Sequence, residues 1–170
     1  VIGTQSSGKS SLLNSIIGFD ILPVGKNMVT KSPFSIELYN DERESVFQIG
    51  EYQSGKFIVT KSIPLNEYPI SNVTSGRIES CINDIYKARG ITKNISTEPI
   101  STRIYSKYVP FLSLIDLPGL ISVPRTDDGQ PPDLKEKIIS LINSYAENSN
   151  TVILGVIAAR EDIEVDMAME

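Results

Sequence analysis

Histidine and tryptophan are absent from the 170 residues, and cysteine occurs once, at Cys81. Without histidine the chain cannot form a Ser-His-Asp or Cys-His catalytic triad, or a metal site that needs imidazole. With one cysteine it cannot form an intrachain disulfide or a cluster of metal-binding thiolates. A lone thiol is typical of a reducing compartment, so we expect the sequons at Asn72 and Asn94 to carry no glycan.

Long apolar runs and an excess of positive charge are missing as well. No apolar stretch approaches the roughly 18 residues that a membrane-spanning helix needs. The chain has 16 lysines and arginines against 21 acidic residues, so its net charge is −5 and no nucleic-acid partner is expected. Hydrophobic residues make up 40% and charged residues 22%, which is typical of a packed globular domain.

The two ends of the sequence indicate part of a domain. Val1 and Ile2 precede a glycine-rich loop, whereas a buried strand normally has about 5–6 residues. The acidic stretch at residues 164–170 has a helix-compatible pattern without a cap or a breaker. We therefore expect residues 1–170 to be one partial domain, truncated at both ends.

Hydrophobic spacing predicts that helices and strands alternate. Amphipathic helices are expected at residues 9–17, 73–89 and 133–148, with Cys81 as a core residue of the second. Strand patterns occur at residues 34–39, 45–49, 56–63, 101–105 and 111–115. The apolar run at residues 151–158 is expected to be a fully buried strand, and residues 20–33 a loop. These elements predict an α/β fold with a mainly parallel central sheet flanked by helices. The polar residues 41–56 are expected to form a hairpin inserted at one edge.

Residues 3–10 fit the phosphate-loop pattern G-x-x-x-x-G-K-[ST]. Gly3 and Gly8 permit backbone geometry that a Cβ atom would obstruct. The N–H groups of such a loop and the start of the following helix hold phosphate oxygens. Lys9 would neutralise the β- and γ-phosphates, and the Ser10 hydroxyl would ligate Mg²⁺. A chance glycine- and serine-rich turn is the alternative, but the flanking strand end and helix favour the phosphate loop.

Two further segments complete a candidate nucleotide site. An apolar strand ends at Asp116, which we expect to hold Mg²⁺ through a water, while Gly119 offers its N–H to the γ-phosphate. Thr30, in the loop after the first helix, would ligate Mg²⁺ and orient the attacking water. Each pattern alone fits an ordinary turn or polar loop. Their positions after a phosphate loop favour the functional interpretation.

This ordered set of motifs resembles the GTPase domain of the dynamin superfamily, in the branch of dynamins, dynamin-related mitochondrial-division proteins and Mx proteins. The resemblance is carried by residues 3–11, 22–23, 29–30, 116–119 and 130–133. It implies a P-loop GTPase fold, GTP hydrolysis, and self-association through GTPase domains. It also implies membrane remodelling or fission through regions outside this chain, with a cytoplasmic location, peripheral membrane association and cytoskeletal partners.

The resemblance also implies roles for individual residues. Gln5 would hold the attacking water. Ser6 would contact the oxygen that bridges the β- and γ-phosphates, and would help to hold K⁺ or Na⁺ together with Gly25. Ser7 and Ser11 are expected among the nucleotide-binding residues.

Departures from the family pattern leave alternatives open. Asn27 replaces a glycine beside the cation position, which leaves open a weakly hydrolysing assembly scaffold, Mx-like or a pseudo-GTPase. The Thr-Lys-x-Asp motif that reads guanine is expected after Glu170, so a P-loop ATPase of another branch is a third alternative. Residues 160–162 stand where the family contacts a partner GTPase domain, or form a solvated charge cluster. Lys31 and Arg103 are either substitutes for an arginine finger or surface residues.

Overall fold

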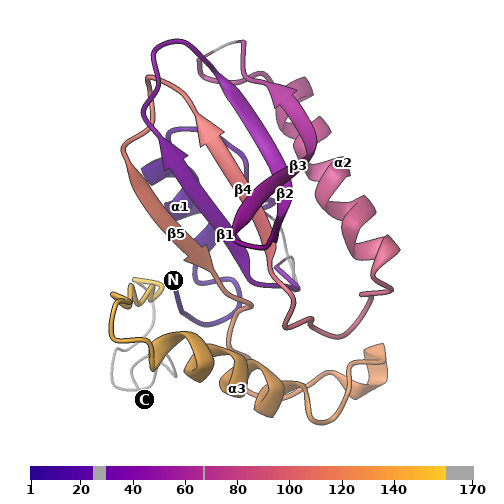
Figure 1. Ribbon diagram of the computed structural model, residues 1–170. Coiled ribbons are helices and arrows are strands. Elements are labelled where there is room, and N and C mark those ends of the chain that lie inside the picture. Colours follow the sequence, from indigo (N-terminus) through magenta and orange to yellow (C-terminus); the bar gives the residue numbers. More distant parts are fainter. Residues whose placement is uncertain (25–29, 67, 160–170) are drawn as a thin grey trace.

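The computed structural model describes residues 1–24, 30–66 and 68–159 (Figure 1). The helices are α1 (Lys9–Ile17), α2 (Asn72–Ala88) and α3 (Leu134–Ala146), with a short 3₁₀ helix, η1 (Thr126–Asp128). The strands are β1 (Phe34–Tyr39), β2 (Val46–Gln53), β3 (Lys56–Pro64), β4 (Ile100–Tyr105) and β5 (Leu112–Asp116). Each of these helices and strands, η1 apart, lies at or close to the position that the hydrophobic spacing predicts.

The five strands form one sheet in the order β3-β2-β4-β1-β5. Strands β1 and β4 are parallel, whereas β1–β5, β2–β3 and β2–β4 are antiparallel. The α/β class is confirmed, but this sheet is mixed rather than mainly parallel. The reason is connection length. Residues 40–45 and 106–111 are too short for a parallel crossover of a dozen or more residues, while α2 supplies one between β3 and β4.

The β2–β3 hairpin lies at the edge of the sheet, as the sequence predicts, although its strands extend to Pro64. Ser54 and Gly55 form its two-residue turn, and both have a positive φ, 50° and 77°. A type I′ turn needs this geometry at both central residues, and it matches the twist of the flanking strands.

The apolar run at residues 151–158 departs from expectation. It forms a single bridge between Gly155 and Ile2, in which Ile2 N–H donates to the Leu154 carbonyl at 2.9 Å. Val152 is 93% exposed and Ile153 51% exposed, so the prediction of a fully buried strand is wrong. An apolar composition favours the burial of a strand, but full burial also requires other elements that cover both of its faces. Among the described residues these two side chains are not covered in that way.

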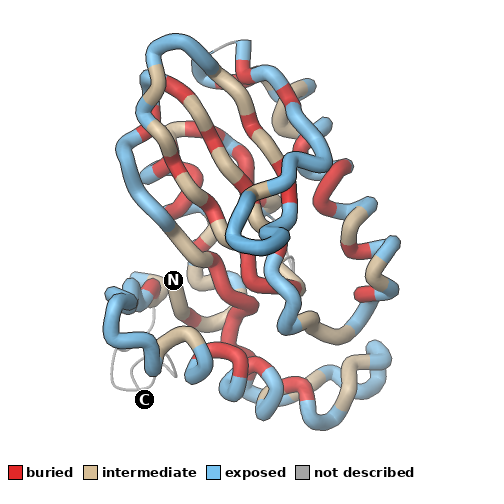
Figure 2. The backbone as a smooth tube through the Cα atoms, in the orientation of Figure 1, coloured by how far each residue is buried: buried red, intermediate tan, exposed pale blue. Residues whose placement is uncertain are grey.

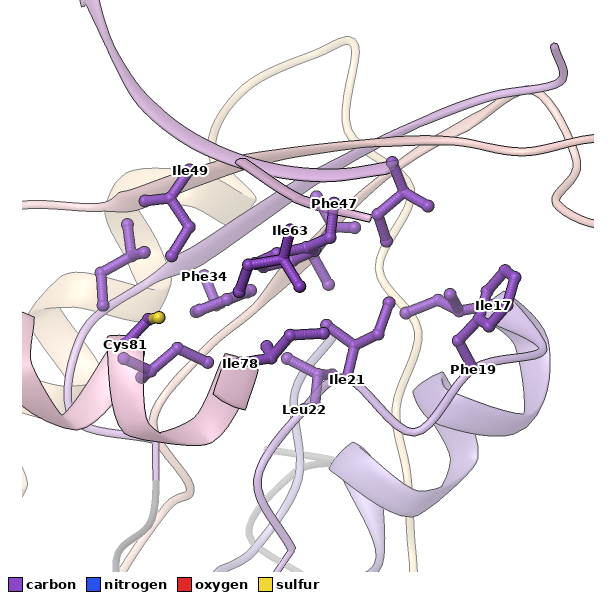
Figure 3. Packing of buried hydrophobic residues seen from close by; sticks show 14 of the residues in the cluster. Ile17, Phe19, Ile21, Leu22, Phe34, Phe47, Ile49, Ile63, Ile78 and Cys81 are labelled. Atoms are coloured by element: carbon purple, nitrogen blue, oxygen red, sulfur yellow. The ribbon is translucent and has the colours of Figure 1, made fainter. Parts of the chain in front are cut away.

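The main core lies between the sheet and the helices α1 and α2, which cover the same face. Figure 3 shows Phe34, Phe47 and Ile63 of the sheet opposite Ile78 and Cys81 of α2. Cys81 is 6% exposed, which confirms it as a core residue. Buried residues alternate with less buried ones along β1 and β4 (Figure 2), as expected for strands with one covered face.

A second, smaller core joins α3 to the segment that follows β5. Leu134 and Ile138 of α3 pack against Leu117 and Leu120. In Figure 1, α3 lies beyond the end of the sheet at which β5 ends. Because residues 116–120 are anchored in this cluster, the end of β5 has packing partners on α3.

Arg103 lies on the outer face of the sheet, opposite the helices. Its Nε donates to Glu37 Oε2 at 2.8 Å, and its guanidinium lies 4.3 Å from the centre of the Phe57 ring. The side chain therefore belongs to a local ion pair and aromatic contact on β1, β3 and β4, which agrees with the surface interpretation of this arginine.

Asn14 links α1 to the segment that follows it. This side chain is 5% exposed. Its amide donates to the Leu22 carbonyl at 3.0 Å, and its oxygen accepts from the N–H groups of Ile21 (3.2 Å) and Leu22 (2.9 Å). The Ile21 N–H also donates to the Phe19 carbonyl at 3.0 Å, so Asn14 is the described partner on which the N–H and the carbonyl of Leu22 depend.

We expect Asn14→Leu to lower the free energy of unfolding by about 2–4 kcal/mol, because it leaves buried backbone groups unsatisfied at nearly constant side-chain volume. Urea unfolding of the variant and the wild type measures the difference. Ser15→Ala, on the exposed side of the same helix, is the control and should change stability by less than about 0.5 kcal/mol. Equal unfolding midpoints for Asn14→Leu and wild type would contradict the linking role of Asn14.

Candidate functional site

The phosphate loop follows Val1 and Ile2 and leads directly into α1. Gly8 directly precedes the helix with φ 96°, and Ser6 has φ 68°. A Cβ atom on Gly3 would lie 2.4 Å from the Val156 carbonyl oxygen and 2.8 Å from Ser7 Oγ. Gly3 is thus required by a close backbone approach, and Gly8 by a left-handed conformation. The loop ends at the N-terminus of α1, and the free backbone N–H groups of a helix N-terminus are suited to binding anions.

Lys9 folds back over the loop. It is 7% exposed, and its Nζ donates to the carbonyl oxygens of Gly3 at 3.2 Å and Thr4 at 3.1 Å. The two carbonyl oxygens hold the Lys9 ammonium against the loop. An anionic group bound there would therefore meet a fixed positive charge.

The segment after β5 packs directly on the loop. Gln5 N–H donates to the Leu120 carbonyl at 2.8 Å, and Leu120 N–H donates to the Gly3 carbonyl at 3.0 Å. A Cβ atom on Gly119 would lie 2.9 Å from both Gln5 Cα and Lys9 Nζ. Gly119 is buried at this contact, so the loop and the end of β5 are held together through backbone.

Asp116 and Thr30 meet across 86 residues of sequence. Asp116 is fully buried at the end of β5, and its Oδ2 accepts a hydrogen bond from Thr30 Oγ1 at 3.0 Å. Burial raises the pKa of Asp116 above its ordinary value, while Lys9 and the hydroxyls of Thr30 and Ser10 favour the ionised carboxylate. The other carboxylate oxygen, Oδ1, is buried with no hydrogen-bond partner among the described residues.

This donor set fits Mg²⁺. The ion prefers oxygen ligands, and two hydroxyls and a carboxylate converge at the start of α1 and the end of β5. The buried Oδ1 of Asp116, which lacks a partner in the described part of the chain, is an oxygen that a cation or its bound water would satisfy. Ser10, Thr30 and Asp116 are therefore the residues that would hold the metal.

The remaining residues singled out by sequence lie around this centre. Ser6 and Ser11 are exposed, and Ser7 Oγ is buried without a partner among the described residues. Gln5 lines a cavity of about 270 Å³, together with Lys31, Thr92, Lys93, Arg125, Asp128 and Gln130. Gly25, Asn27 and residues 160–162 lie outside the described residues, so their roles stay predictions.

Tyr86 is a residue that sequence reasoning missed. Its hydroxyl, on α2, accepts a hydrogen bond from Lys31 N–H at 3.1 Å. Burial raises the pKa of this tyrosine, so the phenol is neutral near pH 7. The only signal in the sequence is an aromatic residue on the buried side of an amphipathic helix. That pattern predicts a core position and does not reveal a contact 55 residues away.

The family model described as the Dynamin family matches residues 1–168. The chain belongs to the dynamin family. It is 38% identical to Dynamin-1-like protein of Danio rerio, 35% to Dynamin-B of Dictyostelium discoideum and 34% to the mitochondrial Dynamin-like GTPase MGM1 of Chaetomium thermophilum. All three alignments cover 100% of this chain, which spans 24%, 20% and 16% of those proteins. The α/β architecture agrees with the P-loop GTPase fold of this family.

Within residues 1–24, 30–66 and 68–159, none of the helices has the length and apolar character needed to span a bilayer.

We expect Gly119→Ala to lower the free energy of unfolding by about 1–3 kcal/mol, because the new methyl group would overlap the backbone of Gln5. Thermal or urea unfolding measures the loss. Gly76→Ala is the matched control: an added Cβ at Gly76 in α2 meets no atom within 4 Å. Alanine at that helical position should raise stability by up to about 1 kcal/mol. If both substitutions had the same effect, the close approach at Gly119 would not constrain the fold.

Proposed function

We propose that this chain binds GTP and hydrolyses it to GDP and phosphate, as part of the GTPase domain of a dynamin-like large GTPase. The observation that carries the proposal is the hydrogen bond between Thr30 and the buried Asp116, beside Lys9 and the phosphate loop. This hydrogen bond joins two motifs that are 86 residues apart in sequence, and nucleotide hydrolysis requires both of them beside a phosphate loop. Membership of the dynamin family supports GTP as the nucleotide.

Phosphate binding follows from the loop and Lys9. The backbone N–H groups at the start of α1 and the Gly119 N–H would donate to phosphate oxygens. The Lys9 ammonium, which donates to two carbonyl oxygens, would donate to the β- and γ-phosphates when a nucleotide binds. Ser7 and Ser11 would add contacts from the loop and from α1.

Water attack would depend on positioning. A bound Mg²⁺, held by Ser10, Thr30 and Asp116, supplies positive charge that offsets the charge on the phosphates. Thr30 and Gln5 would orient the attacking water. Since the chain contains no histidine, imidazole is not available as a base, and proton transfer would fall to the phosphate itself or to a partner domain. Ser6, Gly25 and Asn27 would hold K⁺ or Na⁺ near the bridging oxygen.

The proposed activity extends to assembly and membranes through the rest of the protein. We propose nucleotide-dependent self-association through GTPase domains, coupled to membrane remodelling or fission, at a cytoplasmic and peripheral membrane location. Membrane and cytoskeletal contacts would involve regions outside this chain. Turnover of GTP by the intact protein in potassium, sodium and choline buffers tests the catalytic part. A protein that binds GTP tightly but barely turns it over in all three would instead be an assembly scaffold, consistent with Asn27 in place of glycine.

We expect Lys9→Ala to abolish detectable nucleotide binding, at a cost on the order of 2–5 kcal/mol, because the phosphate charge would lose its buried counter-charge. Titration of the intact protein with a fluorescent GTP analogue measures the affinity. Lys61→Ala, an exposed lysine on the edge strand β3, controls for net charge and should bind as the wild type does. An affinity of Lys9→Ala equal to that of the control would remove Lys9 from the phosphate site.

We expect Thr30→Ala to bind GTP almost normally and to hydrolyse it about 10²–10³-fold more slowly, because a group that positions water acts mainly in the transition state. Analogue affinity and single-turnover rate are measured on the same preparation. Thr60→Ala removes a hydroxyl that donates to the Ile49 carbonyl far from the site, and should leave the rate unchanged. Undiminished turnover by Thr30→Ala would show that the threonine is structural.

A further inference from the structure

Lys31, the residue directly after Thr30, is held on both sides of its backbone. Its N–H donates to the Tyr86 hydroxyl at 3.1 Å, and its carbonyl accepts from Ser96 N–H at 2.8 Å. The peptide unit that carries the Lys31 N–H also carries the Thr30 carbonyl. Because a peptide is planar, a hydrogen bond to this N–H fixes the orientation of the plane that leaves Thr30.

The two anchors of Lys31 are themselves fixed. Tyr86 is 5% exposed on α2, and its ring lies 5.6 Å below the Lys31 ammonium. Ser96 belongs to a segment that the end of α2 holds: Arg89 donates to the carbonyls of Glu98 at 3.1 Å and Pro99 at 3.3 Å. The end of α2 thus holds Lys31 in two ways: directly through the Tyr86 hydroxyl, and indirectly through residues 96–99.

On the other side of Thr30, the threonine hydroxyl reaches the buried carboxylate of Asp116 at 3.0 Å. Thr30 therefore lies between a partner on β5 and an anchor on α2. A hydroxyl can ligate a metal or orient water only if its backbone is placed to within a fraction of an ångström.

We propose that Tyr86 is a positioning residue for Thr30: its phenol oxygen, by holding the Lys31 N–H, sets the peptide plane from which Thr30 presents its hydroxyl to Asp116 and to the attacking water. This inference rests on the proposed GTPase function and deepens it. It assigns to α2, a helix with no residue in the nucleotide motifs, control over the rate of the chemical step.

The experiment uses Tyr86→Phe in the intact protein. Phenylalanine keeps the buried ring and its contact with Lys31 but removes the oxygen that accepts the Lys31 N–H. We expect the single-turnover rate of GTP hydrolysis to fall between about 10- and 100-fold. Affinity for a fluorescent non-hydrolysable GTP analogue should stay within about twofold, because the hydrogen bond that is removed goes to Lys31 and not to a residue of the phosphate loop. Amide hydrogen exchange at Lys31 should become faster, independently of activity.

Tyr39→Phe is the matched control. It removes a tyrosine hydroxyl that donates to Glu37 at 2.8 Å on the outer face of β1, and it should leave rate and affinity unchanged. A double-mutant cycle with Thr30→Ala then tests the route of the effect. If Tyr86 acts through Thr30, Tyr86→Phe should slow the Thr30→Ala protein no further.

The outcomes separate this inference from the function on which it rests. If the wild-type protein hydrolyses GTP and Tyr86→Phe hydrolyses it equally fast, the positioning role is wrong while the function stands. A parallel loss of rate and affinity, or effects that multiply fully with those of Thr30→Ala, would also overturn it in favour of general destabilisation. Faster Lys31 exchange together with slower turnover at unchanged affinity supports it. Absence of turnover in the wild type would refute the function first.

Discussion

Two backbone segments approach so closely at the centre of this protein that only glycine fits between them. The segment after β5 exchanges two hydrogen bonds with the phosphate loop, and a Cβ atom on Gly119 would overlap Gln5 and the Lys9 ammonium. On the other side of the loop, the Val156 carbonyl excludes a side chain from Gly3. Because the loop is confined from both sides, the position of Lys9 and the start of α1 relative to Asp116 is fixed by backbone rather than by adaptable side chains.

The segments on either side of this contact are in turn packed into the two hydrophobic cores. Residues 117–121 are anchored against α3, while β1, which follows the Thr30 loop, packs its buried face against α1 and α2. The Thr30–Asp116 hydrogen bond spans the junction between these two cores. Burying an ionised carboxylate is costly, and Lys9, Thr30 and Ser10 offset part of that cost, although burial still raises the pKa of Asp116 above its ordinary value. The same groups that make Asp116 tolerable in the core are those that a metal and a phosphate would recruit.

The positions of the secondary structures followed from sequence to a large extent, whereas the roles of the site residues stay predictions. The helices and strands are at or near the ranges that hydrophobic spacing predicts, and the clearest cases, β1, β4, α2 and α3, each have one apolar face against a core. The direction of the strands was harder to predict. The sheet is mixed because the connections at residues 40–45 and 106–111 are too short for a parallel crossover, and hydrophobic periodicity carries no information on strand direction. The run at residues 151–158 looked buried because it is apolar, yet Val152 and Ile153 are exposed in the described fold.

Sequence by itself determined which groups are available for the proposed chemistry: a glycine-containing loop, a lysine, two hydroxyls and a carboxylate in a fixed order, with no histidine and a single cysteine in the 170 residues. These follow from residue type and local spacing, which short-range geometry controls. The tertiary structure alone decided that Thr30 reaches Asp116, that Asn14 holds the segment after α1, and that Tyr86 holds the peptide after Thr30. Contacts across 86 and 55 residues depend on how the helices pack on the sheet, and the packing of buried surfaces leaves no local pattern in the sequence from which such a hydrogen bond could be inferred.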